Sequence, residues 1–270
     1  MKKIKDQNVR LYNGVEMPLI GAGFWLVPNE IAGRVTKDAL SLGYRMLDTA
    51  QGYGNELGIG EMLESLNIKR ENVFITSKIL AEIKNYKDAK ESILESLKKL
   101  RVDYIDLMLI HAPRPWDEMS ECKYNYFKEN LEVWKAMTEC YNDGLIRAIG
   151  VSNFSVDDLK NIMDNSSIKP MVNQVCFNPH NRPLELIKFC QDNDIAFEAY
   201  SPLEHGTAKD SKKVLEIAKK YNVSFAQVCL KYVLSHGTIA IPKATSIDHL
   251  RNNLELDFDI DKEDLASLDK

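Results

Sequence analysis

Residues 48–56 read DTAQGYGNE, which places a carboxylate, Asp48, five residues before a phenol, Tyr53, at a predicted strand-to-helix turn. Two further ionisable residues end the apolar runs that follow: Lys78 ends VFITSK, and His111 ends YIDLMLIH. In a barrel of alternating strands and helices, the carboxyl ends of the strands meet at one face, where catalytic groups from different strands gather. We therefore predict that these four side chains share one pocket.

These four residue types suit acid–base chemistry. A phenol with a reference pKa of about 10 is a weak proton donor at neutral pH, and a nearby ammonium group such as that of Lys78 lowers this pKa. Asp48 would keep the lysine charged, and a neutral His111 can orient a substrate carbonyl through one hydrogen bond. Tyr53 would then be a general acid toward a carbonyl oxygen. Because no side chain supplies the hydride that must attack the carbonyl carbon, a nicotinamide cofactor is implied.

The order of short motifs along the chain is similar to that of a known family. DTAxxYGNE, TSK and LIH are followed by GVSNF, NQ, YSPL and IPKATS, after an amino-terminal GVEMPLIGAGFW. Over nearly its whole length the chain resembles the aldo-keto reductase superfamily, in its short bacterial type. The resemblance implies a (β/α)8 TIM barrel with an N-terminal β-hairpin and a C-terminal extra helix, as one domain over residues 1–270. It matches Asp48, Tyr53, Lys78 and His111 to the family's catalytic tetrad.

Size and composition agree with one globular α/β barrel. The chain has 270 residues, of which 44% are apolar and 28% charged, and this excludes a disordered protein. A net charge of −5 at pH 7 without a basic run argues against nucleic-acid binding. No stretch has the length of a membrane span or the pattern of a leader, so we expect a cytoplasmic monomer that does not bind membranes.

The five cysteines are interpreted as reduced packing residues. They show neither CxxC spacing nor an even count, and they stand at positions 122, 140, 176, 190 and 229. A disulfide framework or a zinc site is therefore not expected.

Short apolar runs alternate with amphipathic segments along the chain. Asn13-Gly14 between apolar residues predicts a hairpin over residues 9–16, and PLIGAGF predicts the first barrel strand. The other strands, which lack in/out alternation as expected under a cover of helices, should start near residues 44, 73, 104, 146, 171, 196 and 238. This gives eight barrel strands.

Helix signals complete the pattern. Apolar spacing predicts helices over 87–100 and 224–235, and Ser155 with Asp158 resembles a capping box, as does Ser224 with Gln227. The glycines after Tyr53 do not have GxGxxG spacing, which disfavours a doubly wound dinucleotide-binding sheet.

The family resemblance also implies which residues hold the nicotinamide. Ser152, Asn153 and Gln174 would bind its carboxamide. Tyr200 would stack on its ring, since an aromatic face can hold a flat heterocycle. Taken singly, each polar residue could equally be an ordinary loop or strand-end residue.

The phosphates would lie along a second segment. By resemblance, Ser201 and Leu203 would contact the pyrophosphate. In the resembled family the segment that matches IPKATS holds the adenosine end of the cofactor. Because backbone amides at a helix start together with a cation form a phosphate site, the resemblance implies that Lys243, Thr245 and Ser246 fit a 2′-phosphate. NADPH is therefore the expected cofactor.

The adenosine end departs from the usual family pattern. Asn253 is retained for the adenine contact. However, His249 stands where Arg is usual, Ala244 where Ser is usual and Asn252 where Glu is usual. A histidine is mostly neutral at pH 7 and lacks the two-pronged hydrogen bonding of arginine. We expect weaker discrimination against NADH, so that NADH can also serve.

The substrate side departs as well. By resemblance, Trp25 lines the substrate site, but His111 is followed by Ala112 where the family usually has Trp. Trp116 in the same loop could replace that missing wall, or it could be a packing residue. We expect an open, permissive pocket for small carbonyl compounds.

Other function classes remain open. The same fold can host a noncatalytic nicotinamide-binding sensor or regulatory subunit. A metal-dependent barrel hydrolase would use Asp48 and His111 as ligands, but the histidines lack HxH and HExxH spacing, so no metal is expected. The function predicted from the sequence is reversible, NADPH-dependent reduction of aldehydes or ketones to alcohols.

Overall fold

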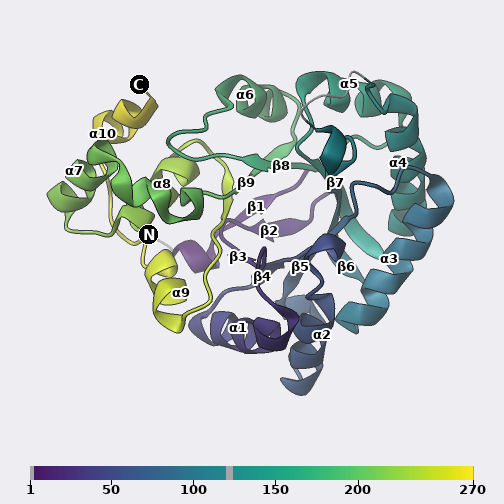
Figure 1. The fold of residues 1–270 in the computed structure, drawn as a ribbon, viewed down its shortest axis with the longest axis horizontal. Coiled ribbons are helices and arrows are strands. Elements are labelled where there is room, and N and C mark those ends of the chain that lie inside the picture. The colour runs from purple at the N-terminus through teal and green to yellow at the C-terminus, as the bar shows by residue number, and fades with distance from the viewer. Residues whose placement is uncertain (1–2, 120–123, 270) are drawn as a thin grey trace.

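The computed structural model describes residues 3–119 and 124–269, and its main feature is a ring of parallel strands (Figure 1). Over these residues the strands are β1 (Asn8–Arg10), β2 (Glu16–Pro18), β3 (Ala22–Gly23), β4 (Met46–Asp48), β5 (Phe74–Ile79), β6 (Ile105–Ile110), β7 (Ile146–Ser152), β8 (Val172–Cys176), β9 (Ala196–Tyr200) and β10 (Ile239–Ile241). Strands β3 to β10 pair in chain order. The ring closes where Gly21 N donates to Ala240 O over 2.9 Å. The predicted barrel is confirmed.

Helices cover the outside of the ring, as Figure 1 shows. In chain order they are α1 (Asn29–Leu42), α2 (Glu56–Ser65), α3 (Tyr86–Leu100), α4 (Phe127–Asn142), α5 (Val156–Asn165), α6 (Leu184–Asp192), α7 (Lys212–Tyr221), α8 (Phe225–Ser235), α9 (Ile247–Leu254) and α10 (Lys262–Ala266). Two of them, α7 and α8, lie between β9 and β10. The short α10 is the predicted extra helix.

Local sequence signals explain where several helices begin. The Ser155 hydroxyl accepts a hydrogen bond from the Asp158 amide, and the Ser224 hydroxyl accepts one from the Gln227 amide. In both cases the side chain three residues into the helix bonds back to the amide of the serine, so both predicted capping boxes are confirmed. These caps fix the starts of α5 and α8 beside the barrel.

The hairpin of β1 and β2 lies at the amino ends of the barrel strands. The Tyr12 hydroxyl donates to Lys169 O over 2.7 Å, just before β8. The Asn13 side chain donates to Arg147 O over 2.9 Å, near the start of β7. The predicted hairpin is confirmed, and it leaves the carboxyl ends of the strands, where the site is expected, uncovered by this element.

Glycines of α2 serve helix packing. A Cβ at Gly58 would lie 2.5 Å from Asn29 O in α1, and one at Gly60 would lie 2.4 Å from Lys99 O in α3. Both distances are shorter than carbon and oxygen atoms tolerate, so glycine allows α2 to approach its two neighbours closely. Gly58 and Gly60 thus have a packing role in the barrel wall.

The strands that carry the predicted site are buried along their length. Every residue of β5 and of β6 is buried, which agrees with the expected lack of alternation. The cysteines at 140, 176, 190 and 229 are free thiols, and position 122 lies outside the described residues. Across residues 3–119 and 124–269, no helix is both long and apolar enough to cross a membrane.

Candidate active site

A buried ammonium group is the centre of the site. Lys78 lies in β5 with its side chain 0% exposed, and Nζ donates to Asp48 Oδ1 over 2.7 Å and to Thr49 O over 2.8 Å. The Tyr53 hydroxyl lies 3.3 Å from the same nitrogen. Asp48 ends β4, and Tyr53 ends the 3-10 turn Gln51–Tyr53 that follows it. The parallel pairing of β4 with β5 therefore brings three of the predicted residues together.

His111 joins this group from the end of β6. Its ring meets the Tyr53 ring edge to face, with centroids 5.5 Å apart. Burial, together with the charge on Lys78, lowers the pKa of His111 to about 3. The imidazole is therefore neutral at physiological pH and can form a hydrogen bond without carrying a charge.

Burial and charge act against each other on the lysine and the phenol. Burial by itself would lower the pKa of Lys78, but Asp48 and Tyr53 outweigh it and hold the pKa above its usual value. Burial raises the pKa of Tyr53, and Lys78 acts in the opposite direction. Lys78 thus acts in the direction expected from the sequence, but burial outweighs it. The phenol is protonated at neutral pH, as a general acid must be.

The residues expected to hold a nicotinamide are bonded to the same group. Gln174 Nε2 donates to Asp48 Oδ2 over 2.7 Å, and the Ser152 hydroxyl donates to Gln174 O over 2.8 Å. The Asn153 amide donates to His111 O over 3.0 Å. One hydrogen-bonded network therefore contains both predicted sets.

Three more predicted residues follow one another after β9. The Tyr200 hydroxyl donates to Asn153 Oδ1 over 2.9 Å, and burial raises the pKa of Tyr200 to about 12. Ser201 has a positive φ of 49°, which turns the chain sharply at the strand end. Leu203 is partly buried against the core. The structure thus places these residues beside the network, at the same end of the barrel.

Glu198 was missed by the sequence analysis. It lies in β9, its side chain is fully buried, and Oε2 accepts a hydrogen bond from Gln174 Nε2 over 2.7 Å. The available signal was a single acid in FEAY, a run otherwise fit for a buried strand. A carboxyl group in a buried strand needs a hydrogen-bond partner or must be protonated, because an isolated buried charge is unfavourable.

The segment expected to bind the adenosine end is mostly exposed. Lys243, Ser246 and His249 are exposed, and the Ser246 hydroxyl accepts a hydrogen bond from His249 N at the start of α9 over 3.2 Å. Arg34 of α1 donates to Thr245 O over 3.1 Å, which brings to this segment a cation that the sequence analysis did not single out.

Asn253 differs from the rest of this segment. Its side chain is 2% exposed and faces the hydroxyl of Tyr44, which itself donates to Leu250 O over 3.0 Å. The Asn253 side chain therefore lies on the buried side of α9, whereas His249 lies on its exposed side.

The two tryptophans lie in different surroundings. Trp116 is 45% exposed, and its ring lies edge to face against His111 with centroids 5.1 Å apart. Trp25 is 43% exposed and packs against His205, with centroids 5.0 Å apart. The structure therefore brings Trp116 into contact with His111 of the tetrad.

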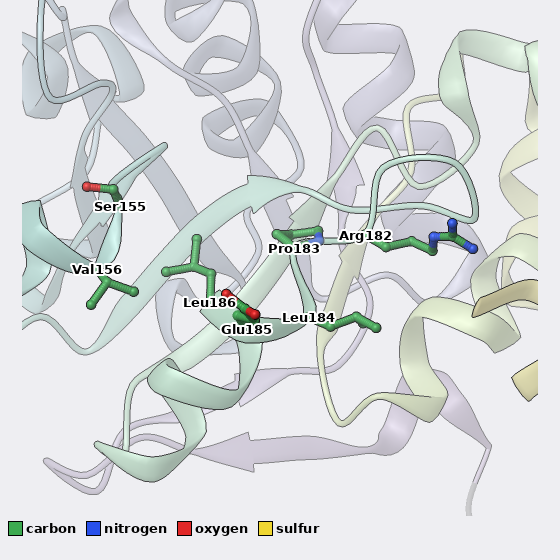
Figure 2. A pocket seen from close by; sticks show the side chains of 7 residues that line it. All are labelled: Ser155, Val156, Arg182, Pro183, Leu184, Glu185 and Leu186. Carbon is green, nitrogen blue, oxygen red and sulfur yellow. The ribbon is translucent and has the colours of Figure 1, made fainter. Parts of the chain in front are cut away.

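A surface groove of about 500 Å³ lies between the starts of α5 and α6. Figure 2 shows its lining, which consists of Ser155, Val156 and residues 182–186. Those lining residues do not include Asp48, Tyr53, Lys78 or His111, so the groove is separate from the candidate site. Within the described parts of the chain, no three His, Cys, Asp or Glu side chains are grouped so that they could hold a metal ion.

Comparisons with known proteins agree on one family. The sequence model of the Aldo/keto reductase family matches residues 20–270. Glyoxal reductase of Bacillus subtilis is 40% identical over 268 residues, which is 98% of this chain and 92% of that protein. Methylglyoxal reductase DkgA of Escherichia coli is 34% identical over 265 residues, which is 97% of this chain and 92% of that protein.

Solved structures give the same result. An aldo/keto reductase from Brucella melitensis superimposes with a TM-score of 0.90 at 33% identity, over 97% of this chain and 98% of the other. A Bombyx mori aldo-keto reductase in complex with NADP gives a TM-score of 0.87 at 31% identity, over 97% of this chain and 91% of the other.

Proposed function

This chain belongs to the Aldo/keto reductase family of oxidoreductase enzymes, and from that premise we propose that it uses NADPH to reduce small aldehydes or ketones to alcohols. The proposal rests above all on Lys78, whose ammonium lies 2.7 Å from Asp48 Oδ1 and 3.3 Å from the Tyr53 hydroxyl. A protonated phenol beside a fixed ammonium is equipped to give up its proton and to be stabilised as a phenolate.

The donor set suits a nicotinamide cofactor. The hydroxyl of Ser152 and the amides of Asn153 and Gln174 match a carboxamide, and the ring of Tyr200 offers a flat surface for the heterocycle. Exposed Lys243, which lies between the end of β10 and the start of α9, suits a phosphate together with the backbone amides at the start of that helix. When bound, the cofactor supplies the hydride that adds to the carbonyl carbon. The NADP complex of the Bombyx mori relative supports this choice.

Each tetrad residue then has one task. Tyr53 donates its proton to the carbonyl oxygen as negative charge develops there, and Lys78 stabilises the phenolate that remains. Asp48 keeps Lys78 protonated and in place. The neutral imidazole of His111 orients the carbonyl oxygen by a hydrogen bond. In the reverse direction, the Tyr53 phenolate would accept the proton of the alcohol.

The central test removes the phenolic hydroxyl. We expect Tyr53→Phe to lower kcat by at least about a thousandfold, because proton transfer in the transition state is lost. The dissociation constant for NADPH should change less than about twofold. Tyr86→Phe, in which the lost hydroxyl bonds to Glu139 on the outside of the barrel, is the matched control and should turn over normally. A Tyr53→Phe enzyme with most of its activity would contradict the proposal.

The substrate class can be examined with the same assay. Glyoxal and methylglyoxal are the first compounds to test, because the two bacterial relatives are named for them. Bulky aldehydes form the second half of the panel. Turnover of both groups would support an open pocket, and a sharp preference for one small compound would contradict it. A protein that binds NADPH but reduces none of these carbonyls would favour the sensor alternative.

A further inference from the structure

Glu198 is a buried acid that the proposed mechanism does not use. It lies in β9, and its side chain is 0% exposed. Its Oε2 accepts from Gln174 Nε2 over 2.7 Å, and the same nitrogen donates to Asp48 Oδ2 over 2.7 Å. Its other oxygen, Oε1, is buried and has no hydrogen-bond partner among the residues that the structure describes. One amide thus links this acid directly to the tetrad.

An ionised Glu198 would be unfavourable in this position. A carboxylate out of water needs a compensating charge or several hydrogen bonds, and Oε1 has neither. The charge of Lys78 is already paired with Asp48 over 2.7 Å. Burial, and then repulsion from Asp48, raise the pKa of Glu198 to about 8, although the Gln174 amide and Lys78 oppose this.

The charged and titratable groups that face Glu198 come from the neighbouring elements. Asp48 belongs to β4, Lys78 to β5 and Tyr53 to the turn after β4. On β10, the residue paired with Glu198 is the apolar Ile239. With Glu198 protonated, one negative and one positive charge balance in this cluster. With Glu198 ionised, the cluster carries one excess negative charge.

We propose that Glu198 is a positioning residue that holds a proton at neutral pH and thereby keeps a second negative charge away from Tyr53, Lys78 and Asp48. The inference rests on the proposed role of Tyr53 as the acid. When Glu198 loses its proton to bulk water, its charge raises the pKa of Tyr53. A weaker acid transfers its proton more slowly, so carbonyl reduction should slow as pH rises.

Kinetics can isolate this effect. The rate of a single reductive turnover, followed by cofactor absorbance, should fall about three- to tenfold between about pH 7 and about pH 9.5 in the unmodified enzyme. Glu198→Gln keeps the shape and hydrogen bonding but cannot ionise, so it should not show this fall. The same fall in Glu198→Gln would overturn the proposal.

A second buried acid provides the matched control. Glu56 in α2 is 2% exposed and accepts from the Ser77 hydroxyl over 2.7 Å. Ser77 precedes Lys78 in β5, and successive side chains of a strand point to opposite faces, so Glu56 lies outside the ring. Glu56→Gln should keep the pH profile of the unmodified enzyme. If neither variant showed the fall in single-turnover rate at alkaline pH, the effect would be a general one of removing buried acids, and the proposal would be overturned.

Infrared difference spectroscopy of the cofactor-free protein tests the proton independently of activity. Raising the pH from about 6 to about 10 should remove the carbonyl band of a protonated carboxylic acid, with a midpoint at about 8. Glu198→Gln, or Glu198→Met if the first variant does not fold, should lack this change. A spectrum without such a band overturns the inference even if Tyr53→Phe is inactive. An active Tyr53→Phe would overturn the proposed mechanism, and the infrared titration would still decide the charge of Glu198.

Discussion

The proposed catalytic centre and the segment proposed to bind the adenosine end lie at the same end of the barrel, yet they differ in how their polar groups are held. In the centre, Lys78, Asp48 and Gln174 are buried and joined by hydrogen bonds of 2.7 Å. In the segment around the start of α9, Lys243 and His249 are exposed to solvent. A buried polar group that loses its partner costs stability, whereas an exposed one finds water. The centre therefore tolerates few residue types, and the segment can vary without affecting the fold.

The largest effect in this comparison is expected at Lys78. Lys78→Met should lower kcat by at least about a thousandfold, because Tyr53 loses the cation that stabilises its phenolate. It should also destabilise the fold by about 3–5 kcal/mol, because Asp48 is left as an unpaired buried charge. Single-turnover rates and urea unfolding measure the two effects.

The exposed ion pair of Lys188 with Asp192 on α6 provides the control for the stability effect. Lys188→Met should leave the urea midpoint almost unchanged, because water replaces an exposed partner. If both lysine variants unfolded at the same urea concentration, the contrast between buried and exposed groups would be lost.

His111 should make stability depend on pH. Its pKa is about 3 in the folded protein against 6.5 for an ordinary histidine, so between these values the unfolded chain binds more protons. Stability must then fall as pH falls from 6.5, by at most about 1.4 kcal/mol per pH unit. Urea unfolding from about pH 7 to about pH 5 should show a steeper loss in the unmodified protein than in His111→Gln. His249→Gln, which removes an exposed histidine, should retain the full slope.

The sequence predicted the barrel and the tetrad because both depend on local patterns. Apolar runs ending in Lys78 and His111 mark strands of a parallel sheet, and parallel strands bring their carboxyl ends to one face. Asp48 ends the strand before the one that carries Lys78, and Tyr53 lies in the turn that follows, so both were expected at the same face. The capping boxes at Ser155 and Ser224 were predictable for the same reason, since each is complete within four residues.

Other features depend on distances that no local pattern reveals. Glu198 meets Asp48 through Gln174, and the three residues are far apart in the chain. The net rise in the pKa of Tyr53 depends on the depth of its burial, which the sequence does not specify. The contact between Arg34 and Thr245 O likewise depends on how α1 lies beside the segment after β10.

Trp116 is intermediate between the buried centre and the exposed segment, since it is 45% exposed but contacts His111. We expect Trp116→Ala to lower kcat/KM for aromatic aldehydes by about tenfold, because an aromatic contact with the substrate is lost. Methylglyoxal, which has no ring to contact the indole, should be less affected. Trp25→Ala, which removes the contact with His205, provides the comparison. Equal losses for large and small substrates would argue against a wall formed by Trp116.

The smallest effect is expected at His249, in the exposed segment proposed to bind the adenosine end of the cofactor. His249→Arg should tighten NADPH binding by about tenfold, since a charge-assisted hydrogen bond to a phosphate contributes about 1.4 kcal/mol more than a neutral side chain does. NADH lacks the 2′-phosphate, so its dissociation constant should not change. Fluorescence titration measures both constants, and His249→Gln should match the unmodified protein for both cofactors. The gain in NADPH affinity of His249→Arg should be smaller at high salt, because salt screens an exposed charge. An unmodified enzyme that already prefers NADPH by more than about a thousandfold, roughly 4 kcal/mol, would show that histidine at this position costs little and that Arg34 or Lys243 suffices for the phosphate.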